Sequence, residues 1–204
     1  ADDQVTYRTT WYDQNGLKIK PAEIHSLAQD LDGDLWVGTN EGLFLIPSTV
    51  DFATSDRCER VIIPRNDGTQ LADYLLDKEK ITSIVVDGAN RKWIGTANAG
   101  VFLLSEDGLE TIEHFTAENS PLLNNTILSI AILETTGEVF IGTGEGLMSY
   151  MSDALPAEDD FTNIYAYPNP VLPNYKGEVV IKGLMAGTQV RILDASGNLV
   201  KVLP

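Results

Sequence analysis

The chain has 204 residues, 43% of them hydrophobic, and a formal net charge of −16 from 30 acidic and 14 basic side chains. This length allows one full domain, or a partial domain followed by a small one. So acidic a surface repels phosphate backbones, which excludes nucleic acid as an expected partner. No apolar run reaches the ~18 residues that a membrane-spanning helix needs, and no basic-then-apolar signal segment opens the chain.

A short pattern occurs three times, over residues 24–44, 81–102 and 127–148. Each copy has a first run of alternating residues, a tight turn, and a second run that ends in a Gly-Thr pair. A further glycine turn then leads into a third run. One such unit cannot bury its own apolar face, so neighbouring copies are expected to stack side by side.

The runs are short, rich in β-branched residues and bounded by turn residues, which is typical of β-strands. The expected strands are 24–29, 35–39 and 43–46 in the first copy, 81–86, 92–96 and 101–104 in the second, and 127–132, 139–143 and 147–150 in the third. Segments 61–63 and 110–115 are candidates for outer fourth strands. Four short strands in about 40–50 residues are typical of a β-propeller blade.

The intervals between the copies differ in length. The largely polar stretch 66–80 is expected to be a surface insertion, and one extra residue before Gly142 predicts a bulge or a longer turn in the third copy. Propellers have about four to eight blades, so three are too few to close a ring. Residues 1–155 are therefore expected to be the last part of a larger propeller, whose open blade edges favour self-association.

The composition changes after the third copy. A polar stretch begins at Ser152, and residues 156–163 are expected to form a linker. Strand-like runs at 178–182, 189–193 and 199–203 then predict a small antiparallel β-sandwich over 164–204. The expected fold class is thus all-β: a partial β-propeller of three four-stranded blades, followed by a small antiparallel β-sandwich.

The motif Tyr167-Pro168-Asn169-Pro170 stands at the start of this tail. Each proline removes a backbone donor and restricts the residue before it. From these physical properties alone, the motif is interpreted as a rigid domain boundary, at which the prolines keep the backbone extended before the first strand of the tail.

Two resemblances to known families add to this interpretation. Residues 32–44, with the lead-in 11–17, resemble the two-component-regulator propeller repeat, which is common in the exported sensing parts of hybrid histidine kinases. Segments 167–171, 179–181 and 190–200 resemble the C-terminal sorting domain of type IX secretion in Bacteroidetes, in a form that lacks the last strands of that family. Repeats followed by such a tail resemble the C-terminal part of the PorZ-type family. That resemblance implies two propellers, a sandwich, and a place in the complex that attaches cargo to anionic lipopolysaccharide.

Few residues suggest chemistry. Aspartates alternate around a glycine over residues 30–34, as in a calcium loop, but the matching turns of the other copies lack them, and both residue types also favour simple turns. His25 and His114 have no nearby cysteine or second histidine that would complete a metal site. Acidic neighbours oppose activation of the Cys58 thiol. We therefore expect no catalytic residue, metal or cofactor, and a protein that is not an enzyme.

The turns after the Gly-Thr pairs are the candidate recognition site, because they occupy equivalent positions and are expected to cluster on one propeller face. The residues concerned are Asn40, Glu41, Asn98 and Glu145. Their side chains suit polar or carbohydrate contacts. The expected partners are secretion-system proteins, or lipopolysaccharide and other carbohydrates.

Three functions remain open at this point. The leading hypothesis is an exported scaffold or recognition protein related to type IX secretion, at the outer membrane, the cell surface or in the periplasm. The alternative is the periplasmic ligand-sensing propeller of a hybrid two-component regulator, which would continue into another β-sandwich, then a membrane helix and a kinase. A third is a cargo protein that carries the sorting domain. The motif at 167–170 argues against the sensor.

Overall fold

The computed structural model describes residues 5–65, 72–154, 164–172, 174–185 and 187–203. Every named element within these ranges is a β-strand, and all named strands pair in the antiparallel sense. The prediction of an all-β chain is therefore confirmed. None of the described residues forms a helix long and apolar enough to cross a membrane. The chain divides into two compact units, residues 1–155 and 156–204.

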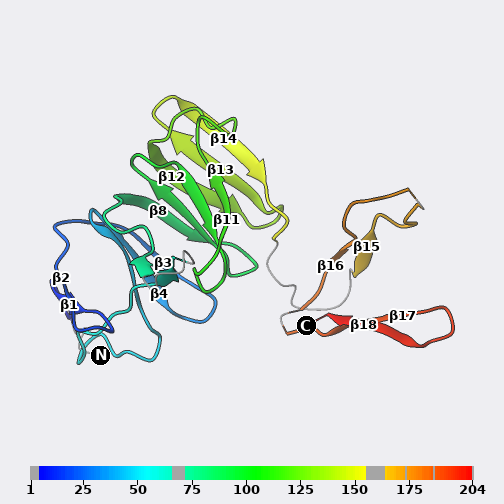
Figure 1. Ribbon diagram of the computed structural model, residues 1–204, viewed down its shortest axis with the longest axis horizontal. Coiled ribbons are helices and arrows are strands. Elements are labelled where there is room, and N and C mark those ends of the chain that lie inside the picture. Colours follow the sequence, from blue (N-terminus) through cyan, green and yellow to red (C-terminus); the bar gives the residue numbers. More distant parts are fainter. Residues whose placement is uncertain (1–4, 66–71, 155–163, 173, 186, 204) are drawn as a thin grey trace. The chain divides into compact units, whose positions relative to one another are not determined.

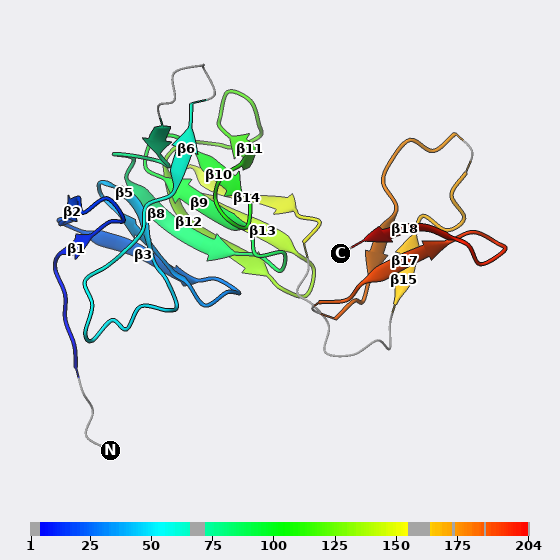
Figure 2. The ribbon, with the colours of Figure 1, turned by 60° about the horizontal axis from the view of Figure 1, so that its bottom comes forward.

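The first unit contains one sheet for each copy of the repeat, and the nine expected repeat strands are all present. The first sheet is β3 (Ile24–Gln29), β4 (Leu35–Thr39) and β5 (Gly42–Ile46). The second is β8 (Ile81–Val86), β9 (Lys92–Thr96), β10 (Val101–Leu104) and β11 (Thr111–Phe115), and the third is β12 (Ile127–Leu133), β13 (Glu138–Thr143) and β14 (Gly146–Met151). Figures 1 and 2 show the three sheets stacked in chain order, with β8 lying between β3 and β12.

The outer strands follow the prediction only in part. β11 pairs with β10, as expected for residues 110–115, and gives the second sheet four strands. Residues 61–63 do not extend the first sheet, because β6 (Ile62–Pro64) pairs with β7 (Ala72–Tyr74) instead. The first sheet gains only a single bridge, between Leu45 and Glu59. Within the described residues, the first and third sheets therefore have three named strands, not four.

The expected surface insertion at 66–80 also needs correction. Residues 66–71 lie outside the described ranges, but residues 72–74 form β7, and the next residue, Leu75, is buried in the apolar core between the first two sheets. This part of the stretch is structural, because it supplies both a partner strand for β6 and a core side chain.

The extra residue of the third copy does not lengthen its turn. β12 and β13 pair from Leu133 to Glu138, and the short turn between them closes through amides of Thr136 and Gly137 that donate to the carbonyl of Leu133. β12 and β13 are each one residue longer than β8 and β9, so the extra residue goes into strand pairing. A register shift does occur near the start of β12, but β3 and β8 have the same shift.

Neighbouring sheets interlock through a glycine and a serine. A Cβ atom on Gly38 would lie 2.6 Å from Cγ2 of Ile81, so only a residue without a side chain allows this approach. The backbone amide of Ile84 also donates across the junction, to the hydroxyl of Ser26 at 2.7 Å. Apolar side chains, including Trp36, fill the remaining space between these two sheets. Gly38, and Gly95 at the next junction, thus permit the stacking that the repeat predicts.

A buried ion pair also ties the first sheet to the second. Lys92 of β9 is fully buried, and its Nζ lies 3.1 Å from Oδ2 of Asp30 and 5.1 Å from the centre of the Trp36 ring. The same ammonium donates to the carbonyl oxygen of Glu106. The Asp30 carboxylate accepts further hydrogen bonds from Nε1 of Trp36, at 2.8 Å, and from two amides of its own turn. Every charge in this contact therefore has a partner, as burial requires.

The environment of Asp30 favours its ionised form. Burial works to raise the pKa of the carboxyl, but the hydrogen bonds from Trp36 and Lys92, together with the charge of Lys92, lower the pKa below its ordinary value. A lowered pKa in the folded state means that Asp30 stabilises the fold above its unfolded pKa of about 3.9. This contribution is lost as the pH falls through the lowered pKa.

The second unit contains two separate two-stranded sheets. β15 (Tyr165–Tyr167) pairs with β16 (Val180–Lys182), and β17 (Val190–Leu193) pairs with β18 (Leu199–Leu203). The turn between β17 and β18 is closed by Asp194, which accepts hydrogen bonds from the amides of Ser196 and Asn198, both at 2.8 Å. A β-sandwich over 164–204 stays a prediction, and the expected linker at 156–163 lies outside the described residues.

Gly95→Ala is expected to destabilise the first unit, because the new methyl group would overlap the side chain of Ile127. Overpacking of this kind costs about 1–3 kcal/mol. Gly144→Ala is the matched control, since nothing lies within 4 Å of the position that its Cβ would take. Urea unfolding followed by tryptophan fluorescence compares the two variants. Equal midpoints would contradict the role assigned to Gly95.

Lys92→Met is expected to reduce the free energy of unfolding by about 3–5 kcal/mol, because it leaves the Asp30 carboxylate buried without its cation. The double variant Asp30→Asn/Lys92→Met should lose less than the two single variants added together. Lys201→Met is the control for loss of an exposed lysine. Urea unfolding at pH 7 measures all four variants. Additive losses would show that the two side chains are not coupled.

Asp30→Asn is expected to weaken the dependence of stability on acid. As the pH falls below about 4, the wild-type protein loses the contribution of the ionised Asp30, whereas the variant has none to lose. The difference in unfolding free energy between the two proteins should therefore shrink as the pH falls through this range. A difference that stays constant from pH 7 to pH 2 would show that the pKa of Asp30 is not lowered.

Candidate functional site

The aspartates of the first turn have structural roles. Asp30 is held by the contacts described above. Oδ1 of Asp34 accepts a hydrogen bond from the amide of Ser48 at 2.7 Å, and Oδ2 of Asp32 accepts one from Nδ2 of Asn90 at 2.8 Å. These contacts favour a structural turn over a calcium loop. In the described part of the chain, no group of three or more acidic, His or Cys side chains is placed to hold a metal ion.

The second copy repeats this arrangement with different partners. Oδ2 of Asp87 accepts hydrogen bonds from Nε of Arg91 at 2.8 Å and from Nε1 of Trp93 at 3.3 Å. Asn90 takes the left-handed conformation in this turn, with a φ of 59°. The Asn90 side chain also reaches the first turn, where it accepts from the amide of Leu31 at 2.9 Å. Turn residues thus add to the contacts between the copies.

The threonines of the Gly-Thr pairs hold the candidate recognition turns in shape. The Thr39 hydroxyl donates to the carbonyl of Gly42 at 2.9 Å and accepts from the amide of Glu41 at 3.0 Å. Thr96 and Thr143 make the same two kinds of contact in their copies. The conformation of these turns is therefore held by hydrogen bonds within the turns themselves and does not require a ligand.

The four predicted recognition residues have different surroundings. Oδ1 of Asn40 accepts from the amide of Glu23 at 3.0 Å, and Oε1 of Glu145 accepts from Nδ2 of Asn124 at 2.7 Å. Asn98 is exposed at the tip of its turn. Glu41 is the one of the four that lines the cavity described next. A shared recognition role for the four residues stays a prediction.

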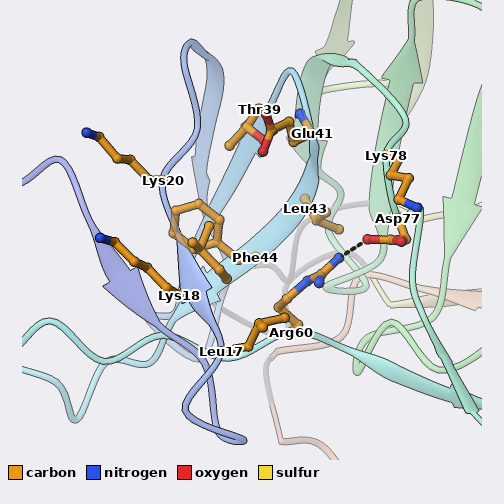
Figure 3. Close-up of a pocket in the computed structure, with 11 residues that line it drawn as sticks. Leu17, Lys18, Lys20, Thr39, Glu41, Leu43, Phe44, Arg60, Asp77 and Lys78 are labelled. Carbon is orange, nitrogen blue, oxygen red and sulfur yellow. Dashed lines mark hydrogen bonds and ion pairs between the residues drawn. The ribbon is translucent and has the colours of Figure 1, made fainter.

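A cavity of about 450 Å³ opens beside the turn between β4 and β5 (Figure 3). Its walls come from that turn, from the end of the hairpin formed by β1 (Trp11–Tyr12) and β2 (Lys18–Ile19), and from the residues before β8. Its lining residues are Leu17, Lys18, Ile19, Lys20, Thr39, Glu41, Leu43, Phe44, Arg60, Asp77 and Lys78. Of these residues only Glu41 was predicted as a recognition residue, and the charged side chains opposite it come from segments that are far apart along the chain.

The charge of this cavity is opposite to that of the whole chain. Lysine and arginine outnumber acidic residues in its lining by four to two, whereas acidic residues dominate the sequence. Arg60 forms an ion pair with Asp77 and lies over the ring of Tyr74, 3.7 Å from its centre. In Figure 3, Lys18 and Lys20 extend roughly parallel to each other, with their ammonium groups directed away from the Arg60–Asp77 pair. Such a surface is suited to hold an anionic group within an otherwise repulsive field.

The motif at 167–170 lies at the end of β15. Tyr167 pairs with Val180 of β16, and both peptide bonds that precede the prolines are cis. Pro168 and Pro170 line an open cavity of about 390 Å³. The role of this motif as a sorting signal stays a prediction.

Cys58 belongs to the apolar core on the outer face of the first sheet. It is 2% exposed. Burial, with a contribution from the charge of Asp13, raises the pKa of its thiol to about 12. The thiol is therefore protonated at neutral pH, as expected for a structural and not a reactive cysteine.

Comparison with known proteins gives a similarity at the level of solved structures. No protein-family model and no curated protein matches the chain. The chain is similar to PorZ, an essential bacterial surface component of the type-IX secretion system of Porphyromonas gingivalis, with 34% identity and a TM-score of 0.70. The match covers 99% of this chain but only 27% of the PorZ chain. The chain is also similar to the extracellular domain of a putative hybrid two-component system of B. thetaiotaomicron, with 23% identity and a TM-score of 0.47. That match covers 71% of this chain and 19% of the B. thetaiotaomicron chain.

Proposed function

We propose that this chain belongs to an exported, non-enzymatic scaffold or recognition protein related to type IX protein secretion. The observation that carries the proposal is the similarity to PorZ, a surface component of that system. Because 99% of the chain is covered, the similarity includes the repeats and the tail together. This similarity supports our proposal that the chain forms three blades of a propeller followed by a small sandwich. The protein then acts at the outer membrane or the cell surface.

The cavity beside Glu41 is the proposed recognition site. Its four cationic side chains stand on a protein of net charge −16, so an anionic group is attracted to this place and repelled by most of the remaining surface. Lipopolysaccharide, which carries anionic groups on a carbohydrate chain, fits this chemistry. Acidic surfaces of secretion-system proteins fit it as well.

The alternative of a periplasmic sensor predicts another sandwich after the repeats, followed by a membrane helix and a kinase module. Here the repeats are followed by the second unit, with its Tyr167-Pro168-Asn169-Pro170 motif. The similarity to PorZ extends through this unit, and together with the motif it supports the proposal of a secretion component.

The test is capture by the purified full-length protein from solubilised outer membranes. We expect it to recover lipopolysaccharide or components of the secretion system. Recovery of neither would overturn the proposed function.

A charge-reversed variant tests the cavity itself. Lys18→Glu/Lys20→Glu/Lys78→Glu is expected to reduce the captured partner at least about tenfold, because three cations near an anionic surface are worth about 1 kcal/mol each. The control makes the same charge change in the second unit, with Lys176→Glu/Lys182→Glu/Lys201→Glu. Equal losses in both variants would show that total charge, and not this cavity, governs binding.

A further inference from the structure

The cationic cavity already contains one carboxylate bound to an arginine. Asp77 forms an ion pair with Arg60, and both residues line the cavity (Figure 3). In this contact, Nη2 of Arg60 donates a hydrogen bond to Oδ1 of Asp77. A guanidinium binds carboxylate and phosphate oxygens through the same planar set of donors. The acidic side chain of Asp77 therefore marks a place in the cavity where an oxyanion is bound.

Arg60 is the fixed member of this pair. Its Cζ lies 3.7 Å from the centre of the Tyr74 ring, and its side chain is only 10% exposed. Gln14 holds its backbone, because Nε2 of Gln14 donates to the carbonyl of Arg60 at 2.7 Å and Oε1 accepts from the amide at 3.0 Å. The Tyr74 hydroxyl donates to Oδ2 of Asp13 at 3.1 Å. These contacts keep the guanidinium in place and join the β1–β2 hairpin to the segment that carries Arg60.

Asp77 is the member of the pair that can give way, because its side chain is 40% exposed. The residues on either side, Leu76 and Lys78, have φ values of 50° and 63°, which are uncommon for residues other than glycine. Such conformations concentrate at ligand sites and switch regions. Gly42 leaves room for this turn, since a Cβ there would lie 3.0 Å from the carbonyl oxygen of Leu76. Asp77 can therefore turn toward solvent, whereas Arg60 stays in the cavity wall.

We propose that Arg60 binds a phosphate group carried by the ligand, and that Asp77 occupies the same position on Arg60 when no ligand is present. This inference rests on the proposed recognition role of the cavity. The lining has two more positive side chains than negative ones. A phosphate monoester, with a charge of about −1.5 to −2 at pH 7, matches that excess, whereas a carboxylate supplies one negative charge.

The exchange makes the cavity selective. A ligand carboxylate would replace the carboxylate of Asp77 on Arg60, so the free energy of binding gains little. A phosphate replaces the same carboxylate and brings a further negative charge toward Lys78, which Figure 3 shows beside Asp77. Asp77 is then an internal competitor that sets a threshold for the charge of the ligand.

Calorimetric titration of the full-length protein with inorganic phosphate at pH 7 tests the proposal. Asp77→Asn is expected to bind phosphate at least about fivefold more tightly than the wild type, because the competing charge is gone. Arg60→Lys is expected to bind it at least about tenfold more weakly, since an ammonium lacks the planar set of donors. Asp73→Asn and Arg65→Lys are the matched controls. They make the same changes in the ion pair between Arg65 and Asp73, and neither residue lines the cavity.

Two further probes define the ligand. Acetate is expected to bind at least about tenfold more weakly than phosphate, because it carries a single negative charge. Glucosyl phosphate is expected to bind at least as tightly as the free ion, since the proposed group is attached to a larger ligand. Equal binding of acetate and phosphate would overturn the selectivity. Binding of the free ion alone would overturn the assignment to a phosphate carried by the ligand.

The direction of the change at Asp77 separates the proposal from a purely structural ion pair. If Asp77 only held Arg60 in position, Asp77→Asn would weaken phosphate binding, and that result would overturn the proposal. A wild-type protein that does not bind phosphate would also overturn it, and so would controls that change binding as much as the cavity variants. Circular dichroism of each variant confirms that it is folded.

The titration contains no outer-membrane material, so its failure is distinct from that of the capture experiment. A protein that captures its partner but does not bind phosphate at Arg60 overturns this inference alone. A protein that binds phosphate there but captures neither expected partner overturns the proposed function alone.

Discussion

The first unit depends on how closely one sheet can approach the next. At Gly38 and Gly95, the absence of a Cβ leaves room for an isoleucine of the following sheet, and a serine hydroxyl accepts an amide hydrogen bond across each junction. Apolar side chains, which include a tryptophan at each junction, then fill the remaining space. The order of the sheets therefore follows the order of the repeats, because each junction joins two consecutive copies.

The sequence predicted those features of the fold that depend on local pattern. Alternation, turn residues and the Gly-Thr pairs located all nine repeat strands. The pairing of β6 with β7 was missed, because it is decided by contacts of Leu75 and its neighbours in the core. Lys92 was also missed as a core residue, since lysine is ordinarily exposed and its acidic partner, Asp30, comes from the preceding copy.

The candidate site was less predictable than the fold. The sequence pattern predicts that the polar turn residues Asn40 and Glu145 are available for recognition. In the structure, their side chains accept hydrogen bonds from other groups of the protein. The cationic cavity brings together Lys18, Arg60 and Lys78, which belong to three separate segments. No spacing rule connects such residues, because the fold alone brings them together. The similarity to PorZ gives this cavity its proposed context, although the chain spans only 27% of that protein's length.

The stacking of the sheets sets the order in which the unit opens. The second sheet has a neighbouring copy on each of its faces, whereas the first and third have one each in the described structure. In a linear array of this kind, the terminal members fray first and the central one opens last. Amide hydrogens of β8 and β9 should therefore exchange with solvent most slowly, and the ion pair of Lys92 protects the side of β9 that faces the first sheet. The middle copy is the kinetic anchor of the unit, although its sequence is no more apolar than that of the third copy.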